Sequence, residues 1–322
     1  MKRVSSAIAA AFVVAGCLAA TAPTNAHAQT KVVLGQASRS ATSWPEFNAE
    51  NLGYFKAEGL LVQSEVVGNV ALIAQQTVGG SLDIGHTTFE IVIQAVESGA
   101  PISLIGSTAI KYPYAMMSAK NVRSAADIKG KKVILPVPKN DIANFFQMWM
   151  DANGLKDADV DRVYDGSSTN RYAALVSGAV SAAAVNSPLN FTAEAAGFNK
   201  LIDFGAYVKG YGFVGVIARK DWLAKNRPTA EAYLRALSKA TDWFYDPANR
   251  EKAIEILMKE TKQERGVSEK TYDYYSELEP FSRRVTIPDA DFDNVLKAFQ
   301  ANGVVKSKDV TRAKYVDLSF IK

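Results

Sequence analysis

Short apolar runs alternate with longer amphipathic segments through the first half of the chain. The runs at 31–36, 60–67, 82–85 and 102–106 are short and rich in β-branched residues, which predicts strands. Segments at 44–57, 69–78 and 90–97 lie between them and end at glycines, which predicts helices. Repeated strand–helix units are typical of a parallel sheet covered by helices on both faces.

A second series of the same kind begins after residue 118. Strands and helices alternate at 132–135, 142–152, 160–164, 172–177, 182–185 and 189–196. The aromatic-rich extended segments 112–118 and 211–218 separate the two series, and we expect them to be strands that cross between two lobes. From Asp221 onward the pattern is helical, at 229–245, 248–260, 269–277 and 289–301. The predicted α/β organisation is residues 29–112 as the first part of lobe I, 113–210 as lobe II, and 211–322 as the second part of lobe I with C-terminal helices.

The first 28 residues have the order of a secretory signal peptide. Lys2 and Arg3 precede a 14-residue apolar stretch at 7–20, and Ala26-His27-Ala28 forms an A-x-A cleavage site. An anchoring helix is disfavoured, because crossing a bilayer takes about 20 residues. Residues 14–17 resemble a lipoprotein box, so in the alternative the signal peptide would be cleaved before Cys17 and a lipid attached to that cysteine. Cleavage after Ala28 would leave 294 residues (322 − 28) without cysteine, in the periplasm.

Composition and charge exclude several classes of protein. The chain is 48% hydrophobic and 22% charged, as globular proteins are, and its net charge of +4 falls to about +2 without Lys2 and Arg3. The sequence contains no run of basic residues of the kind that would indicate nucleic-acid binding. One cysteine excludes an internal disulfide and cysteine-rich metal sites, and His86 is the only histidine after residue 28, so we expect neither a metal nor a cofactor. No G-x-S-x-G segment occurs, and we expect no enzymatic activity.

Polar residues cluster where the predicted strands end and helices begin. Ligands of open parallel sheets bind at this edge, and helix starts offer free N–H groups and a partial positive charge to an anion. Ser43 with Glu46 and Thr87 with Glu90 have capping-box spacing. In the alternative interpretation these residues only cap their own helices. The six junctions are 38–43, 68–69, 86–88, 138–141, 166–171 and 186–187.

Individual side chains in these stretches suggest how a solute would be held. Arg39 or Arg171 could bind a carboxylate or sulfonate through two hydrogen bonds. Trp44, Phe89, Tyr114 or Tyr211 could flank an aromatic or apolar ligand body. The alternative roles are a solvated or structural arginine and a core aromatic residue. The predicted ligand-binding set is Ser38, Arg39, Ser40, Thr42, Trp44, Asn69, Thr87, Thr88, Tyr114, Asn140, Ser168, Thr169, Asn170, Arg171, Asn186 and Tyr211.

Several segments resemble one known family. Residues 47–60 contain Gly-Tyr-Phe followed by Glu-Gly-Leu, and 80–85 form a Gly-x-x-Asp-Ile-Gly turn. With the later landmarks at 98–101, 127–133 and 174–180, they resemble the periplasmic solute-binding proteins of ABC importers, of the nitrate/sulfonate/taurine and thiamine-precursor type. The chain departs from the pattern at Ser181, where that family often has aspartate.

The resemblance implies a fold, a function and partners. The fold is the two-lobe periplasmic-binding-protein (type II) fold with two crossover hinge strands and C-terminal helices. The function is capture of a small organic anion, a sulfonate or an aliphatic or aromatic carboxylate, by lobe closure. A membrane permease with its ATPase would be the partner, and monomers are usual. The alternatives are a protein that binds or makes the pyrimidine precursor of thiamine, and a solute receptor for a sensor kinase.

Overall fold

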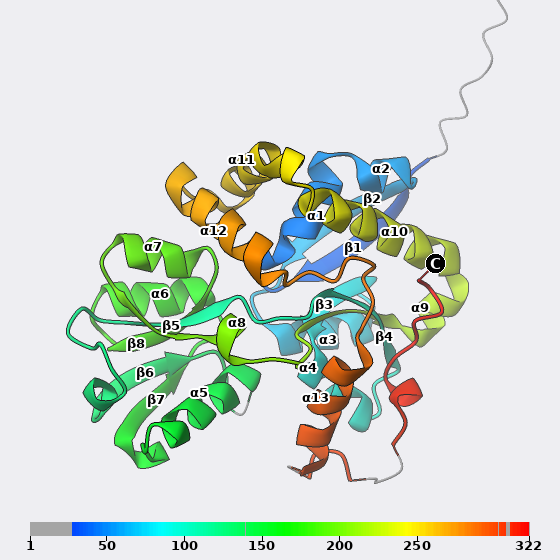
Figure 1. Cartoon of the computed structure of the whole chain (residues 1–322). Coiled ribbons are helices and arrows are strands. Elements are labelled where there is room, and N and C mark those ends of the chain that lie inside the picture. The colour runs from blue at the N-terminus through cyan, green and yellow to red at the C-terminus, as the bar shows by residue number, and fades with distance from the viewer. Residues whose placement is uncertain (1–27, 139, 302, 307–309, 322) are drawn as a thin grey trace, which may run out of the picture.

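The chain folds into two α/β lobes, each built on its own five-stranded sheet (Figure 1). The computed structural model describes residues 28–138, 140–301, 303–306 and 310–321. The predicted signal peptide up to residue 27, including Cys17, lies outside these described residues. No helix among the described residues is long and apolar enough to cross a membrane.

The first sheet has the strand order β2-β1-β3-β10-β4. Four of its strands come from the first 109 residues and run parallel to one another, whereas β10 follows lobe II in the chain and lies antiparallel between β3 and β4. The strands are β1 (Thr30–Gln36), β2 (Leu60–Val66), β3 (Ile84–Thr88), β4 (Ile102–Ala109) and β10 (Val214–Arg219).

The second sheet repeats this plan with the order β7-β6-β8-β5-β9. Here β5, the first strand after the crossing from lobe I, is the antiparallel member. The strands are β5 (Tyr114–Ser118), β6 (Lys131–Leu135), β7 (Val160–Tyr164), β8 (Ala182–Asn186) and β9 (Asn199–Asp203). The expectation of purely parallel sheets was therefore wrong: both sheets are mixed, because the chain reverses direction each time it crosses. Strand β9 was not predicted.

Helices cover both sheets. The helix predicted at 44–57 is divided into two because Gly53 adopts φ 76°, a left-handed conformation that glycine tolerates. The helices before β10 are α1 (Trp44–Asn51), α2 (Tyr54–Ala57), α3 (Val70–Gly79), α4 (Phe89–Glu97), α5 (Asp141–Ala152), α6 (Ser168–Val176), α7 (Leu189–Ala195) and α8 (Phe204–Tyr207).

The C-terminal helices pack mainly on lobe I, and one of them also reaches lobe II. Helix α10 lies against α1, and α13 lies against α4. Helix α12 contacts α7, and Tyr274 on α12 donates a hydrogen bond to Asp203 Oδ1 of lobe II at 2.8 Å (Figure 1). These helices are α9 (Lys220–Lys225), α10 (Arg227–Phe244), α11 (Arg250–Thr261), α12 (Arg265–Leu278) and α13 (Asp289–Ala301).

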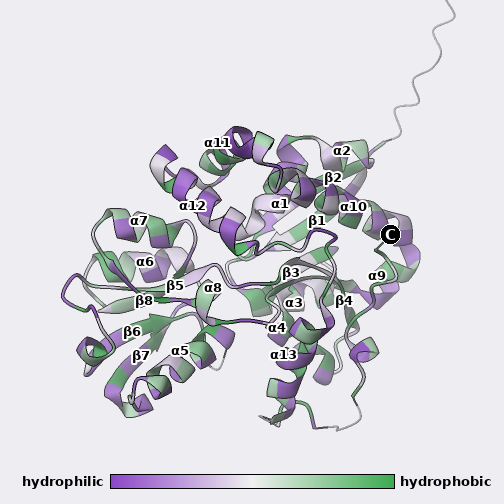
Figure 2. Cartoon of the chain, viewed as in Figure 1, coloured by the Kyte–Doolittle hydropathy of each residue, from purple (hydrophilic) through white to green (hydrophobic). Residues whose placement is uncertain are grey.

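Hydrophobic side chains gather between the sheets and their helices. Helix ribbons show green and purple in alternation, as expected of helices with one face on a core (Figure 2). Strands β3, β4 and β8 are buried along their whole length. In β8 this burial on both faces accounts for the continuous apolar run at 182–185.

Both predicted capping boxes are wrong. Ser43 makes no side-chain cap, and the glutamate three residues later lies 3.0 Å from His86 Nδ1. Helix α4 begins after Thr88 rather than Thr87, and the Thr87 hydroxyl donates to the carbonyl of Val70 at 2.7 Å. Partners from distant segments outcompete the local cap at both sites.

Candidate functional site

A cavity of about 110 Å³ lies where the two lobes meet, at the ends of the strands. The final residues of the parallel strands line it, including Gln36 of β1, Thr88 of β3 and Asn186 of β8. Because β5 and β10 run in the opposite direction, their first residues, Tyr114 and Val214, reach the same edge. All six predicted junctions contribute to the wall, so the strand-end argument located the cavity.

The lobes touch each other around this cavity. Ala41 of lobe I donates its backbone N–H to the carbonyl of Ser187 in lobe II at 3.2 Å. The backbone N–H of Asp141 in lobe II donates to Glu90 Oε2 in lobe I at 2.8 Å. The two lobes are therefore in direct contact beside the cavity.

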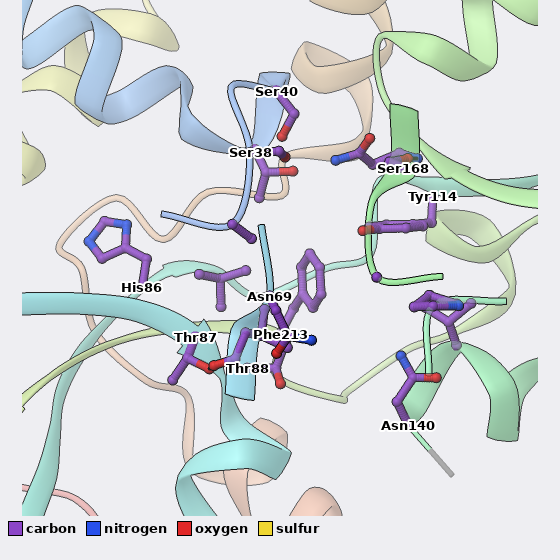
Figure 3. A pocket seen from close by; sticks show the side chains of 18 of the residues that line it. Ser38, Ser40, Asn69, His86, Thr87, Thr88, Tyr114, Asn140, Ser168 and Phe213 are labelled. Carbon is purple, nitrogen blue, oxygen red and sulfur yellow. Dashed lines mark hydrogen bonds between the residues drawn. The ribbon is translucent and has the colours of Figure 1, made fainter. Parts of the chain in front are cut away.

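The structure brings ten of the predicted ligand-binding residues to the cavity wall, and Figure 3 shows most of them facing a common space. They come from both lobes, and hydroxyl and amide side chains predominate. The ten are Ser38, Ser40, Thr42, Asn69, Thr87, Thr88, Tyr114, Asn140, Ser168 and Asn186.

Several of these side chains also cap or fix their own elements. Asn69 Oδ1 accepts hydrogen bonds from Ala71 N and Leu72 N, and Asn140 Oδ1 accepts one from Ala143 N at 2.9 Å. The Ser168 hydroxyl accepts the backbone N–H of Asn186 at 3.0 Å. These residues can therefore both stabilise their own elements and face the cavity. In Asn69 and Asn140 the cap uses only the side-chain oxygen, so the amide nitrogen is left to donate to a solute.

The two predicted arginines do not line the cavity. Arg39 is half-exposed, pairs with Glu260 and lies over the ring of Phe47. Arg171 is fully buried in lobe II, where its Nε donates to the carbonyl of Ala184 and one terminal nitrogen donates to the carbonyl of Asp165, both at 2.6 Å. Burial lowers the pKa of Arg171. The structure gives both arginines scaffold roles.

The other four predicted residues also lie away from the cavity wall. Trp44 is fully buried, donates its indole N–H to the carbonyl of Ala253 at 3.1 Å and packs on Phe244. Tyr211 packs edge-on against Phe145. Thr169 is exposed on α6, and Asn170 donates to the carboxylate of Asp165.

Sequence reasoning missed several residues of the wall. Gln36, Thr108, Tyr112 and Phe213 line the cavity, and so do Glu90 and Asp141, which the sequence suggested only as parts of helix starts. Gln36 and Thr108 are polar residues at the carboxyl ends of β1 and β4, a signal that could have identified both. Phe213 directly precedes β10, and its position depends on the direction of that strand.

Several buried polar atoms on the wall have no hydrogen-bond partner among the described residues, Gln36 Nε2 and Thr108 Oγ1 among them. Asp141 Oδ1, on the same wall, likewise receives no bond from a protein donor. Buried polar groups are nearly always paired, with protein, water or a ligand. Such atoms therefore indicate a space built for a polar occupant.

Two groups of titratable side chains border the cavity. Glu90 and Asp141 form a buried carboxyl pair, and Tyr112 donates its hydroxyl to Asp141 Oδ2 at 2.5 Å. Burial, followed by the charge of Asp141, raises the pKa of Glu90 well above its ordinary value, and burial raises the pKa of Asp141. On the other side, His86 lies 3.0 Å from both a Glu46 carboxylate oxygen and the Tyr233 hydroxyl.

The wall carries little positive charge. Among the described residues no lysine or arginine lines the cavity, and no cluster of three or more metal-ligating side chains occurs. Five helices, α1 with its preceding turn, α3, α4, α5 and α6, instead direct their N-terminal residues at it. An anionic group would be held here by helix starts and hydroxyls.

Two mixed α/β sheets that meet a cavity at their strand ends are the architecture of the periplasmic binding protein fold. The chain belongs to the NMT1/THI5-like family, whose pattern matches residues 41–250. No curated protein sequence matches the chain.

Solved structures of low identity share this fold. A protein from Bordetella bronchiseptica RB50 has a TM-score of 0.75 at 21% identity, covering 91% of this chain and 96% of that one. The periplasmic aliphatic sulphonate-binding protein SsuA of Escherichia coli has a TM-score of 0.67 at 22% identity, covering 90% and 98%. The periplasmic nitrate-binding protein NrtA of Synechocystis PCC 6803 has a TM-score of 0.73 at 16% identity, covering 91% and 87%.

Proposed function

We propose that the chain is the periplasmic substrate-binding component of an ABC importer and binds a small organic acid, a sulfonate or a carboxylate. The observation that carries this proposal is the cavity between the lobes, lined by five helix starts and by buried polar atoms without a protein partner. Neighbours named as sulphonate-binding and nitrate-binding periplasmic proteins support the same class of function.

The mechanism is capture by lobe closure. Solute contacts residues of both lobes, so it stabilises the closed arrangement by its differential affinity for that state. Two hydrogen bonds join the lobes beside the cavity, from Ala41 N to the Ser187 carbonyl and from Asp141 N to the Glu90 carboxylate, and both would break if the lobes separated. The closed protein would then dock on a membrane permease with its ATPase, and we infer a binding role rather than catalysis.

Calorimetry and thermal-shift measurements test the proposal on the mature protein. The panel would contain taurine, ethanesulfonate, propanoate, benzoate, nitrate and a 4-aminopyrimidine of the thiamine-precursor type. We expect micromolar binding, about −8 kcal/mol, for at least one sulfonate or carboxylate. Binding of the pyrimidine alone would favour the alternative function, and no response to any sulfonate or carboxylate would refute the proposed solute class.

A pair of variants locates the site. Ser38→Phe places a ring in the cavity and should abolish binding. Ser81→Phe, on the exposed loop at the opposite edge of the sheet, should leave binding unchanged and serves as the matched control. Retained binding in Ser38→Phe would place the solute elsewhere.

Localisation has its own measurement. The intact mass of protein purified from its host should correspond to a chain that begins at Gln29. A mass with a lipid on Cys17 would instead support the alternative cleavage.

A further inference from the structure

The cavity has a carboxyl pair at one end, with one member from each lobe. Glu90 lies in the first turn of α4 and Asp141 is the first residue of α5, and both side chains are buried. Asp141 N donates to Glu90 Oε2 at 2.8 Å, Tyr112 OH donates to Asp141 Oδ2 at 2.5 Å, and Thr88 Oγ1 donates to Glu90 Oε1 at 3.3 Å. Asp141 Oδ1 receives no bond from a protein donor.

Among the described residues, no lysine or arginine lines the cavity beside this pair. The titratable groups around it are the hydroxyls of Tyr112 and Tyr211, and farther along the wall His86 is already engaged by Glu46 and Tyr233. Burial, and after it the repulsion between two adjacent ionised carboxylates, raises the pKa of Glu90. A positive group must therefore accompany the pair, either a shared proton or part of the solute.

The other end of the cavity has the opposite character. Figure 3 shows Ser38, Ser40 and Ser168 on one side, with Asn140 and Thr88 on the other and the rings of Tyr114 and Phe213 between. Asn140 and Thr88 adjoin the carboxyl pair in sequence. Ser40 precedes the turn before α1, Ser168 begins α6, and Ser38 lies in the loop after β1, and no acidic residue adjoins them in the wall. An anionic group is favoured at the serine end and disfavoured at the carboxyl end.

We propose that Glu90 and Asp141 determine specificity by selecting a solute that carries a nitrogen donor, optimally a cationic amine, at the end opposite its acidic group. This inference rests on the proposed function for the acidic group. The amine would take the place of the shared proton and donate to Asp141 Oδ1 and Glu90, as charge-assisted hydrogen bonds are the strong ones.

Matched solutes test the inference by calorimetry on the mature protein. Each pair shares its acidic group and differs in the amine: taurine with ethanesulfonate, β-alanine with propanoate, and 4-(aminomethyl)benzoate with 4-methylbenzoate. Benzylamine provides the amine without the acid. We expect the amine-bearing member of the best-binding pair to bind about tenfold tighter or more than its partner.

Isosteric variants assign the preference to the pair. Glu90→Gln and Asp141→Asn keep the shape of the wall and should reduce the preference for the amine at least about tenfold, mainly by weakening the amine-bearing member. Ser40→Ala, at the opposite end, should weaken both members of a pair equally. Thermal unfolding of each variant shows that it is folded.

The outcomes separate this inference from the proposed function. Tighter binding of the amine-free members, or an unchanged preference in both isosteric variants, overturns the inference while the proposed function stands. Binding of benzylamine with no binding of any acid supports the role of the pair and refutes the proposed solute class. No binding of any probe refutes both.

Discussion

Replacing Arg171 tests whether its side chain stabilises the fold or contacts the bound solute. The sequence suggested a two-point bond to a bound anion, whereas the structure buries the side chain and directs two of its nitrogens at the carbonyls of Ala184 and Asp165. These bonds tie α6, which begins at the wall residue Ser168, to the middle of β8 and to the loop before the helix. Replacing Arg171 by Leu removes both.

The expected loss is large. Hydrogen bonds to a charged group contribute about 1.5–3 kcal/mol each, so two give about 3–6 kcal/mol. The cost of burying the guanidinium disappears in the variant and offsets part of this. A net loss of about 3 kcal/mol in the free energy of unfolding remains, which lowers Tm by about 6–12 °C for a domain of this size.

Urea unfolding and calorimetry of Arg171→Leu provide the assay. Arg39→Leu is the matched control, because that half-exposed ion pair should contribute at most about 1 kcal/mol. A stability unchanged within about 1 kcal/mol, together with a hundredfold loss of solute affinity, about 2.7 kcal/mol, would refute the scaffold role and restore direct contact.

Three further perturbations follow from the geometry. Trp44→Ala removes a buried indole and its bond to Ala253, and should lower the free energy of unfolding by about 3–5 kcal/mol in urea titrations; a loss under about 1 kcal/mol would contradict this. Gly106→Ala would place a Cβ 2.8 Å from the backbone carbonyl oxygen of Val285 and should cost about 1–3 kcal/mol, whereas an unaltered Tm would show that the segment around Val285 can move away from β4. Because the pKa of Glu90 is raised, the folded protein retains a proton that the unfolded chain releases above about pH 4.3, so this group makes stability fall as pH rises from there through the raised pKa. Glu90→Gln should flatten that part of the Tm–pH profile, and a profile parallel to the wild type would contradict the assignment.

The sequence predicts the order of elements and the location of the cavity well, because both depend on local signals. Apolar runs that end at glycines mark strands and helices, and polar residues after them mark the edge where the strands end. Ser38, Asn69 and Ser168 were found by this reasoning.

Other features depend on contacts between distant segments. The direction of β5 and β10 follows from how the chain crosses between lobes, and it determines that Phe213 faces the cavity. Trp44 stands at a helix start like a ligand residue, but α11 supplies Ala253 to its indole and covers it. Glu90 has the spacing of a capping residue, but its carboxylate accepts a hydrogen bond from the backbone N–H of Asp141 in the other lobe.

The place of β10 has a consequence for how the protein can be built. Strand β10 joins β4 to the rest of the first sheet, although about 100 residues, mostly of lobe II, separate β4 from β10 in the chain. A fragment that stops before Val214 has four parallel strands of that sheet but leaves facing edges of β3 and β4 without a partner. Residues 114–203, by contrast, supply every strand of the second sheet in one uninterrupted stretch. During synthesis, lobe II can therefore assemble its sheet before the older lobe completes its own.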